Sequence, residues 1–250
     1  MGVATDQAPP YGTVVFDCDS TLSFIEGIEE LARECRDEVE ALTARAMNGE
    51  LPLEEAYGAR LELIQPTRAS VNAVAALYLE RALPHARELV LALRALGKRV
   101  VVVSGGLLPA VEPFARALGV EGEDTVHAVE IRFDDDAGAY AGFDDDSPLA
   151  RSGGKVPVLR AIAARSDAGP VAFIGDGATD LEAAGEVQRF IAYGGVERRA
   201  NVFDAARVTC EHADLAALLP LLTTPEERAK LAETGAHAGL LAAAERYATG

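Results

Sequence analysis

The chain has no tryptophan, and only two methionines and three cysteines among its 250 residues. The cysteines, Cys18, Cys35 and Cys210, are widely spaced and none forms a Cys-x-x-Cys pair. An odd number of cysteines without that spacing argues against a disulfide framework and against a structural zinc site. Cysteines that form no disulfide are typical of proteins in the reducing cytosol, so we expect a cytoplasmic protein.

Positive charge is also scarce, because 23 lysines and arginines face 40 aspartates and glutamates, for a formal net charge of −17. Nothing basic is concentrated enough to displace phosphate counterions, which excludes general nucleic-acid binding. No stretch is long and apolar enough to span a bilayer, so we expect no membrane partner. Residues 1–11 lack a basic start and an apolar run, and we expect no signal peptide there. An anionic substrate would need local positive charge or a metal ion.

A short apolar run, Thr13 to Phe16, predicts a buried strand that ends at two acids, Asp17 and Asp19. Ligands of open parallel sheets bind at the carboxyl ends of the strands, which places these acids where chemistry is expected. Taken alone, the acids fit an ordinary strand-to-turn junction about equally well, because Asp is common in turns and helix caps. The rest of the chain decides between the two interpretations.

Helical periodicity dominates the next block, about 24–81, which contains no strand pattern. Apolar residues share helix faces over 25–32, 39–46, 53–64 and 71–79, and Tyr57 and Tyr78 are counted among them. We therefore predict a small helical insertion, or cap, beside the tip of the first strand.

Strands and helices alternate after residue 82, with unbroken apolar strands at 99–103 and 170–174, as in a parallel sheet. Residues 125–133 and 139–143 alternate and predict a β-hairpin, and 225–247 predicts one long helix. The fold predicted is α/β, a doubly wound parallel sheet with an inserted helical-bundle cap. The predicted divisions are a core over 12–23 and 82–222, a cap over 24–81 and a C-terminal helical extension over 223–250.

Polar groups follow three of the predicted strands, and a lysine opens a helix between the last two. Carboxylates gathered at neighbouring strand ends repel one another, and a divalent cation removes that repulsion. Oxygen-only ligands favour a hard ion, most simply Mg²⁺, while a hydroxyl, glycine amides and a lysine suit a phosphoryl group. A carboxylate can act as the nucleophile and a second one as acid and base in phosphoryl transfer. These groups are Asp17 with Asp19, Ser104 with Gly105 and Gly106, Asp176 with Asp180, and Lys155.

Eight segments then carry a resemblance, in family order and with near-family spacing from about residue 13 to 210. They are Asp17-Cys18-Asp19-Ser20-Thr21, Glu26-Gly27-Ile28, Arg45-Ala46-Met47, Arg60, Ser104-Gly105-Gly106, Tyr140-Ala141-Gly142-Phe143-Asp144, Ser152-Gly153-Gly154-Lys155 and Gly175-Asp176-Gly177-Ala178-Thr179-Asp180. The chain resembles the phosphoserine phosphatase family of the haloacid dehalogenase-like superfamily. The Asp-x-Asp pair marks only the superfamily, whereas the last two segments, with Glu26 and Arg60, are specific to the phosphoserine branch.

The resemblance implies a role for each matching residue. Asp17 would be the nucleophile and a metal ligand, and Asp19 the acid and base, with its backbone carbonyl on the metal. Asp176 would be the third protein ligand of Mg²⁺, and Asp180 would support the metal ligands without binding the ion itself. The implied contacts to substrate are Ser104 and Lys155 with the phosphoryl group, Glu26 with the ammonium, Arg60 with the carboxylate, and Met47, Gly105, Gly106, Thr179 and Arg199 around them.

The implied activity is Mg²⁺-dependent hydrolysis of O-phospho-L-serine, a step of serine biosynthesis, through an aspartyl-phosphate, by a monomer or homodimer. Asn48, Leu53 and Leu107 depart from the family pattern, and either Arg198 or Arg199 could face the site. Three alternatives stay open: phosphoryl transfer to another alcohol such as homoserine, hydrolysis of another small phosphomonoester, and a non-catalytic sensor of phosphometabolites.

Overall fold

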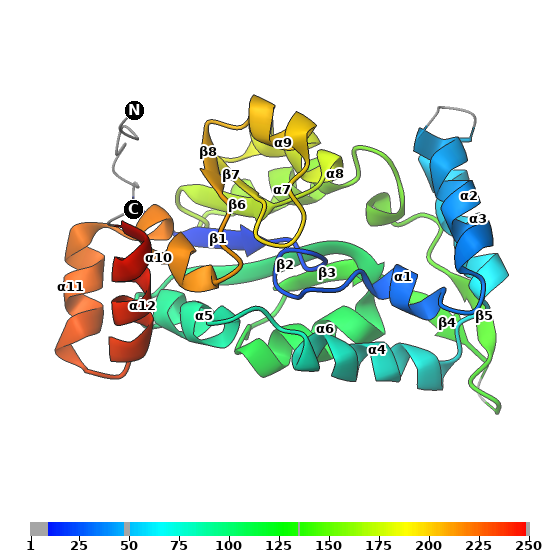
Figure 1. Cartoon of the computed structure of the whole chain (residues 1–250), viewed down its shortest axis with the longest axis horizontal. Coiled ribbons are helices and arrows are strands. Elements are labelled where there is room, and N and C mark those ends of the chain that lie inside the picture. Colours follow the sequence, from blue (N-terminus) through cyan, green and yellow to red (C-terminus); the bar gives the residue numbers. More distant parts are fainter. Residues whose placement is uncertain (1–9, 48–50, 135, 249–250) are drawn as a thin grey trace.

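The computed structural model describes residues 10–47, 51–134 and 136–248, and its centre is a six-stranded sheet (Figure 1). The strands are all parallel and lie in the order β3-β2-β1-β6-β7-β8. Their bounds are β1 Thr13–Phe16, β2 Arg99–Leu107, β3 Val126–Val129, β6 Val171–Gly175, β7 Arg189–Tyr193 and β8 Val208–Cys210.

Each face of the sheet carries its own apolar core. Val14 and Phe16 of β1 belong to one buried cluster and Val15 to the other, as the two-residue period of a strand requires. Helices α5 (Ala86–Ala95) and α6 (Leu108–Leu118) cover the first face, and α7 (Lys155–Ala163), α8 (Ala178–Glu182) and α9 (Ala200–Ala205) the second (Figure 1). The predicted doubly wound α/β fold is confirmed.

Four helices follow β1, at the expected places: α1 Gly27–Leu31, α2 Arg36–Met47, α3 Leu53–Ile64 and α4 Arg68–Glu80. An isolated antiparallel bridge between Ser23 and Ala82 joins the two chain segments that lead into and out of these helices. The α2 and α3 helices pack against each other and stand at one end of the molecule, whereas α4 packs along α6 (Figure 1).

The hairpin predicted for 125–133 and 139–143 is right in its second half and wrong in its first. Strands β4 (Ile131–Phe133) and β5 (Tyr140–Phe143) form the antiparallel pair. Residues Val126–Val129 instead pair in parallel with β2 as the edge strand β3, where Val129 lies opposite Leu107 and is fully buried. Burial of Val129 against the sheet outweighs continuation of the hairpin.

The chain ends in short helices, η3 Leu215–Leu218, α10 Leu219–Leu222, α11 Pro225–Glu233 and α12 Ala238–Ala248. The single helix predicted for 225–247 is wrong, because the chain turns at Gly235 with a left-handed φ of 69°. The buried Lys98 ammonium ties this region to the core by donating to the Tyr11 carbonyl at 2.9 Å and to Glu227 Oε1 at 2.5 Å. Among the described helices, none has the length and apolar character needed to cross a membrane.

Candidate active site

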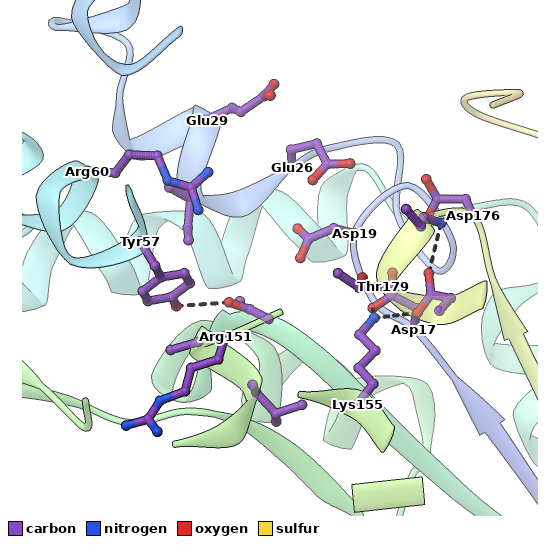
Figure 2. Close-up of a pocket in the computed structure, with 18 of the residues that line it drawn as sticks. Asp17, Asp19, Glu26, Glu29, Tyr57, Arg60, Arg151, Lys155, Asp176 and Thr179 are labelled. Carbon is purple, nitrogen blue, oxygen red and sulfur yellow. Dashed lines mark hydrogen bonds and ion pairs between the residues drawn. The ribbon is translucent and has the colours of Figure 1, made fainter. Parts of the chain in front are cut away.

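Strand register brings the predicted polar groups to one edge of the sheet. Phe16 of β1 lies opposite Val102 of β2 and Ile174 of β6, so the chain segments that follow these residues lie side by side. Asp17 comes directly after β1, Ser104 lies within β2, and Asp176 comes directly after β6. A pocket of about 390 Å³ opens at this edge, facing α1 and α3 (Figure 2).

Three buried carboxylates form the floor of the pocket. Oxygens of Asp17, Asp176 and Asp180 all lie within 4.8 Å of one another. The Lys155 ammonium donates to Asp17 Oδ1 and to Asp180 Oδ1, both at 2.6 Å. Gly175 lets Asp180 come this close, because a Cβ at that position would lie 2.3 Å from the carboxylate carbon of Asp180.

The charges of this cluster are unbalanced. Burial raises the pKa of Asp17 well above its usual range, Lys155 opposes that rise, and Asp180 and Asp19 add to it. Burial lowers the pKa of Lys155, but the attraction of Asp17 and Asp180 outweighs it, so the lysine stays charged. Three carboxylates face the Lys155 ammonium and, at Asp176, the partly exposed Arg199 guanidinium, which still leaves one negative charge in excess. A further cation would balance it, and carboxylate oxygens are the donors that Mg²⁺ prefers. The donor set therefore fits the predicted Mg²⁺.

The Asp19 carboxylate accepts hydrogen bonds at both oxygens. Oδ1 accepts from the Tyr78 hydroxyl at 2.5 Å and from the Gly27 amide at 2.7 Å, and Oδ2 accepts from Ser104 Oγ at 3.2 Å. Ser104 Oγ in turn accepts from the Gly106 amide at 2.9 Å. Ser104 and Gly106, which are both predicted to bind the phosphoryl group, are thus hydrogen-bonded to each other, and Ser104 is also bonded to Asp19.

Groups suited to an amino acid line the opposite wall. Glu26 Oε1 accepts from Ser20 Oγ at 2.6 Å and lies 3.8 Å from the Arg199 guanidinium. Burial, followed by the negative charge of Asp19, raises the pKa of Glu26 to about 7. The Arg60 guanidinium lies 5.6 Å from the centroid of the Tyr57 ring and points into the pocket (Figure 2). Its buried Nε has no hydrogen-bond partner among the described residues, as a group waiting for an anionic ligand would.

The remaining predicted contacts fall as follows. Gly105, Gly106 and Thr179 line the pocket, and so does Arg199, whose guanidinium contacts Asp176 Oδ2. Arg198 points elsewhere, pairing with Glu211 and lying over the Phe203 ring, so Arg199 is the arginine that faces the site. Met47 is the last residue of α2, and its side chain and all of Asn48 lie outside the described residues. The Leu53 side chain also lies outside them.

Two tyrosines at the site were assigned by sequence periodicity to apolar helix faces alone. The Tyr57 hydroxyl donates to the Gly105 carbonyl at 2.9 Å, and the Tyr78 hydroxyl bonds Asp19. A buried tyrosine hydroxyl needs a polar partner, which is the signal that could have identified them. Glu29 and Arg151 also line the pocket, and no motif marked either.

Comparison with known proteins agrees with this geometry. The model of the family described as "haloacid dehalogenase-like hydrolase" matches residues 14–185. Phosphoserine phosphatase of Mus musculus is 41% identical over 196 residues, which are 78% of this chain and 86% of the mouse protein.

Two solved structures show the same likeness in three dimensions. A phosphoserine phosphohydrolase-like protein of Francisella tularensis is 28% identical, with a TM-score of 0.68 over 83% of this chain and 99% of the other. A phospho-aspartyl intermediate analogue of phosphoserine phosphatase is 26% identical, with a TM-score of 0.70 over 86% of this chain and all of the other. The chain therefore belongs to the phosphoserine phosphatase family of haloacid dehalogenase-like hydrolases.

Proposed function

We propose that this protein is a Mg²⁺-dependent phosphatase that hydrolyses O-phospho-L-serine to L-serine and phosphate. The observation that carries the proposal is the buried Asp17 carboxylate, bonded to Lys155 within the acid cluster, beneath a pocket whose far wall holds Glu26 and Arg60. The floor suits a phosphoryl group, and the wall suits the ammonium and carboxylate of an amino acid.

Asp17 is the nucleophile of the proposed reaction. One carboxylate oxygen attacks phosphorus, the bond from phosphorus to the serine oxygen breaks, and an aspartyl-phosphate forms. Asp19 gives its proton to the departing serine oxygen and then takes a proton from the water that hydrolyses the acyl phosphate. Lys155 offsets the negative charge of Asp17 as the dianionic phosphoryl group approaches.

Asp17, Asp176 and the backbone carbonyl of Asp19 would hold Mg²⁺, with Asp180 supporting them. When bound, the ion neutralises charge on the phosphoryl oxygens. Ser104 exchanges its hydrogen bond to Asp19 for one to the phosphoryl group.

The amino acid portion of the substrate lies against the helical insertion in this proposal. Glu26 pairs with the ammonium and Arg60 with the carboxylate, while Thr179 and Arg199 border the phosphoryl end. Met47 packs on the substrate, as the family resemblance implies. Residues 24–81 act as a cap on the core (12–23 and 82–222) and exclude water while the phosphoryl group moves.

The three cysteines are free, which supports a reducing compartment, and we propose a cytoplasmic monomer or homodimer acting on a small phosphomonoester.

Phosphate release from a panel of small phosphomonoesters tests the proposal. We expect the highest kcat/KM for O-phospho-L-serine, and loss of turnover in EDTA that added Mg²⁺ restores. A second series contains homoserine as acceptor. Faster phosphorylation of homoserine than release of phosphate would make the protein a phosphotransferase, and a poor kcat/KM for phosphoserine within the panel would overturn the substrate. No turnover of any ester would favour the sensor alternative.

A further inference from the structure

Tyr78 of α4 contacts the active-site residue Asp19 without lining the pocket itself. Its side chain is fully buried and its ring stacks on Phe114 of α6, with centroids 5.3 Å apart and an interplanar angle of 16°. The hydroxyl at the end of this fixed ring donates to Asp19 Oδ1 at 2.5 Å. The stacking leaves the ring little freedom, so the place of the hydroxyl is set by the packing of α4 on α6.

Gly27 provides the space that this contact needs. A Cβ at Gly27 would lie 2.2 Å from the Tyr78 hydroxyl oxygen and 2.9 Å from the ring carbon that bears it. The Gly27 amide donates to the same Asp19 oxygen at 2.7 Å. The first residue of α1 and a residue near the end of α4 thus converge on one carboxylate oxygen.

The two oxygens of Asp19 consequently have different surroundings. Oδ1 accepts hydrogen bonds from the Tyr78 hydroxyl and the Gly27 amide. Oδ2 lies 3.2 Å from Ser104 Oγ, the hydroxyl proposed to bind the phosphoryl group, and Asp19 lines the pocket beside Asp17 (Figure 2). A carboxylate with one oxygen fixed in this way cannot rotate its other oxygen away from the substrate without losing both donors.

We propose that Tyr78 is a positioning residue that fixes Asp19 Oδ1 so that Oδ2 is the atom that protonates the leaving alcohol. The proposal rests on the proposed phosphatase function. The same hydrogen bond links Asp19 to the helical insertion, since Tyr78 belongs to α4, the last helix of the insertion. The insertion ends a few residues later at Ala82, where the chain returns to the core. The hydroxyl of Ser23, in the segment that leads into the insertion, donates to the Arg81 carbonyl at 2.9 Å and shares the same proton with the Tyr78 carbonyl at 3.3 Å.

Two substrates with different leaving groups distinguish this positioning role of Tyr78 from a purely structural one. An alkyl ester such as O-phosphoserine expels a strongly basic alkoxide that needs the proton of Asp19, whereas p-nitrophenyl phosphate expels a stable phenolate that does not. The ratio kcat/KM reports the steps up to formation of the aspartyl-phosphate, so it isolates the step at which the proton is given. Tyr78→Phe removes the hydroxyl and keeps the stacked ring.

We expect Tyr78→Phe to lower kcat/KM for O-phosphoserine about tenfold, which is a part of the rate enhancement that general acid catalysis typically provides. For p-nitrophenyl phosphate we expect kcat/KM to fall less than about twofold. Gly27→Ala, which displaces the hydroxyl, should give the same pattern. In an Asp19→Asn background Tyr78→Phe should have no further effect, because the group it positions is gone. Tyr193→Phe is the matched control, since it removes another buried hydroxyl, bonded to the His212 carbonyl at 3.0 Å, and should change neither ratio.

Equal losses with both esters, no loss with either, or an additive loss in the Asp19→Asn background would overturn the role of Tyr78 and leave the phosphatase proposal standing. Absence of phosphate release from O-phosphoserine by the unmodified protein would overturn the substrate instead. The Tyr78 comparison would then use glycerol 3-phosphate, another alkyl ester, and its outcomes would be judged in the same way.

Discussion

The Asp17 side chain combines a functional need with an energetic cost. It is buried next to Asp180, and both burial and the negative charge of Asp180 disfavour its charged form, which raises the pKa of Asp17. A carboxyl group whose pKa is higher in the folded than in the unfolded protein stabilises the fold below the unfolded value and loses that stabilisation as the pH rises through the folded value, so ionisation of Asp17 opposes folding. Lys155 reduces this cost without removing it.

Asp17→Asn should therefore separate activity from stability. We expect turnover to fall at least about a thousandfold, because the nucleophile is gone. The urea midpoint should stay equal or rise, because Lys155 keeps its 2.6 Å contact with Asp180 while one buried negative charge is lost. Lys155→Met is the contrasting variant, and leaving Asp17 and Asp180 unpaired should cost about 3–5 kcal/mol. Full turnover by Asp17→Asn would refute its role as nucleophile.

The raised pKa of Glu26 predicts how substrate affinity changes with pH. The carboxylate is charged above about pH 7 and neutral below it, and only the charged form attracts the ammonium of phosphoserine. We expect KM to rise as the pH falls below 7, by up to about tenfold per pH unit. Glu26→Gln should have a raised KM with a flatter profile, and the slope that remains belongs to the substrate phosphate, whose second pKa is about 6. Parallel profiles of the two proteins would contradict the assignment.

The acids and Lys155 could be predicted from the sequence because each follows or precedes a recognisable strand or helix within a few residues. Tyr57 and Tyr78 could not, because periodicity alone places them among the apolar residues of α3 and α4, far along the chain from Asp19. Which tyrosine hydroxyl reaches the site depends on how those helices dock on the core, and one-dimensional spacing does not carry that information.

At the scale of elements, a hydrogen bond at the pocket joins α3 to β2. The Tyr57 hydroxyl bonds the Gly105 carbonyl at 2.9 Å, and its ring lies 5.4 Å from that of Phe143 in β5. The same ring faces the Arg60 guanidinium. Tyr57 thus connects the insertion, the hairpin and the end of β2.

Tyr57→Phe should weaken the packing of the insertion against the core at the pocket, while the contacts of the ring are kept. Loss of the hydrogen bond should weaken the closed arrangement by about 1 kcal/mol, which raises KM for phosphoserine about fivefold. Steady-state kinetics of the variant measure this directly. Tyr140→Phe in β5 is the control, because the buried Tyr140 hydroxyl has no hydrogen-bond partner among the described residues. An unchanged KM in Tyr57→Phe would show that the contact does not contribute to closure.

Element boundaries show where sequence patterns reach their limit. Thr13–Phe16 was predicted with its observed bounds, because apolar residues end abruptly at Asp17. Residues 125–133 read as one strand, yet 126–129 and 131–133 pair with different partners. Alternation indicates that a segment is extended and leaves its partner open, since both neighbours satisfy the same period of two.

On the scale of the whole molecule, the C-terminal helices are part of the main core. Leu231 of α11 and Leu240, Ala243 and Ala244 of α12 are buried in the same cluster as the strand residues that face α5 and α6. In Figure 1 these helices stand at the end opposite to α2 and α3, away from the pocket. They stabilise the sheet without contributing to the site.

Leu240→Ala should therefore destabilise the protein and leave its kinetics intact. Removing this side chain, which is 2% exposed, should cost about 2–5 kcal/mol of unfolding free energy. Urea unfolding measures the loss, and KM for phosphoserine at a permissive temperature serves as the control. An unfolding free energy equal to that of the unmodified protein would show that the extension is not part of the cooperative core.

Trapping the covalent intermediate tests the central claim most directly. The protein is mixed with O-phosphoserine and Mg²⁺, quenched in acid during turnover, and digested for peptide mass spectrometry, with Asp17→Asn as the matched control. The account predicts a phosphoryl group on Asp17 that is absent from the control. A protein that releases phosphate without a phosphorylated peptide, or one phosphorylated on another residue, would contradict it.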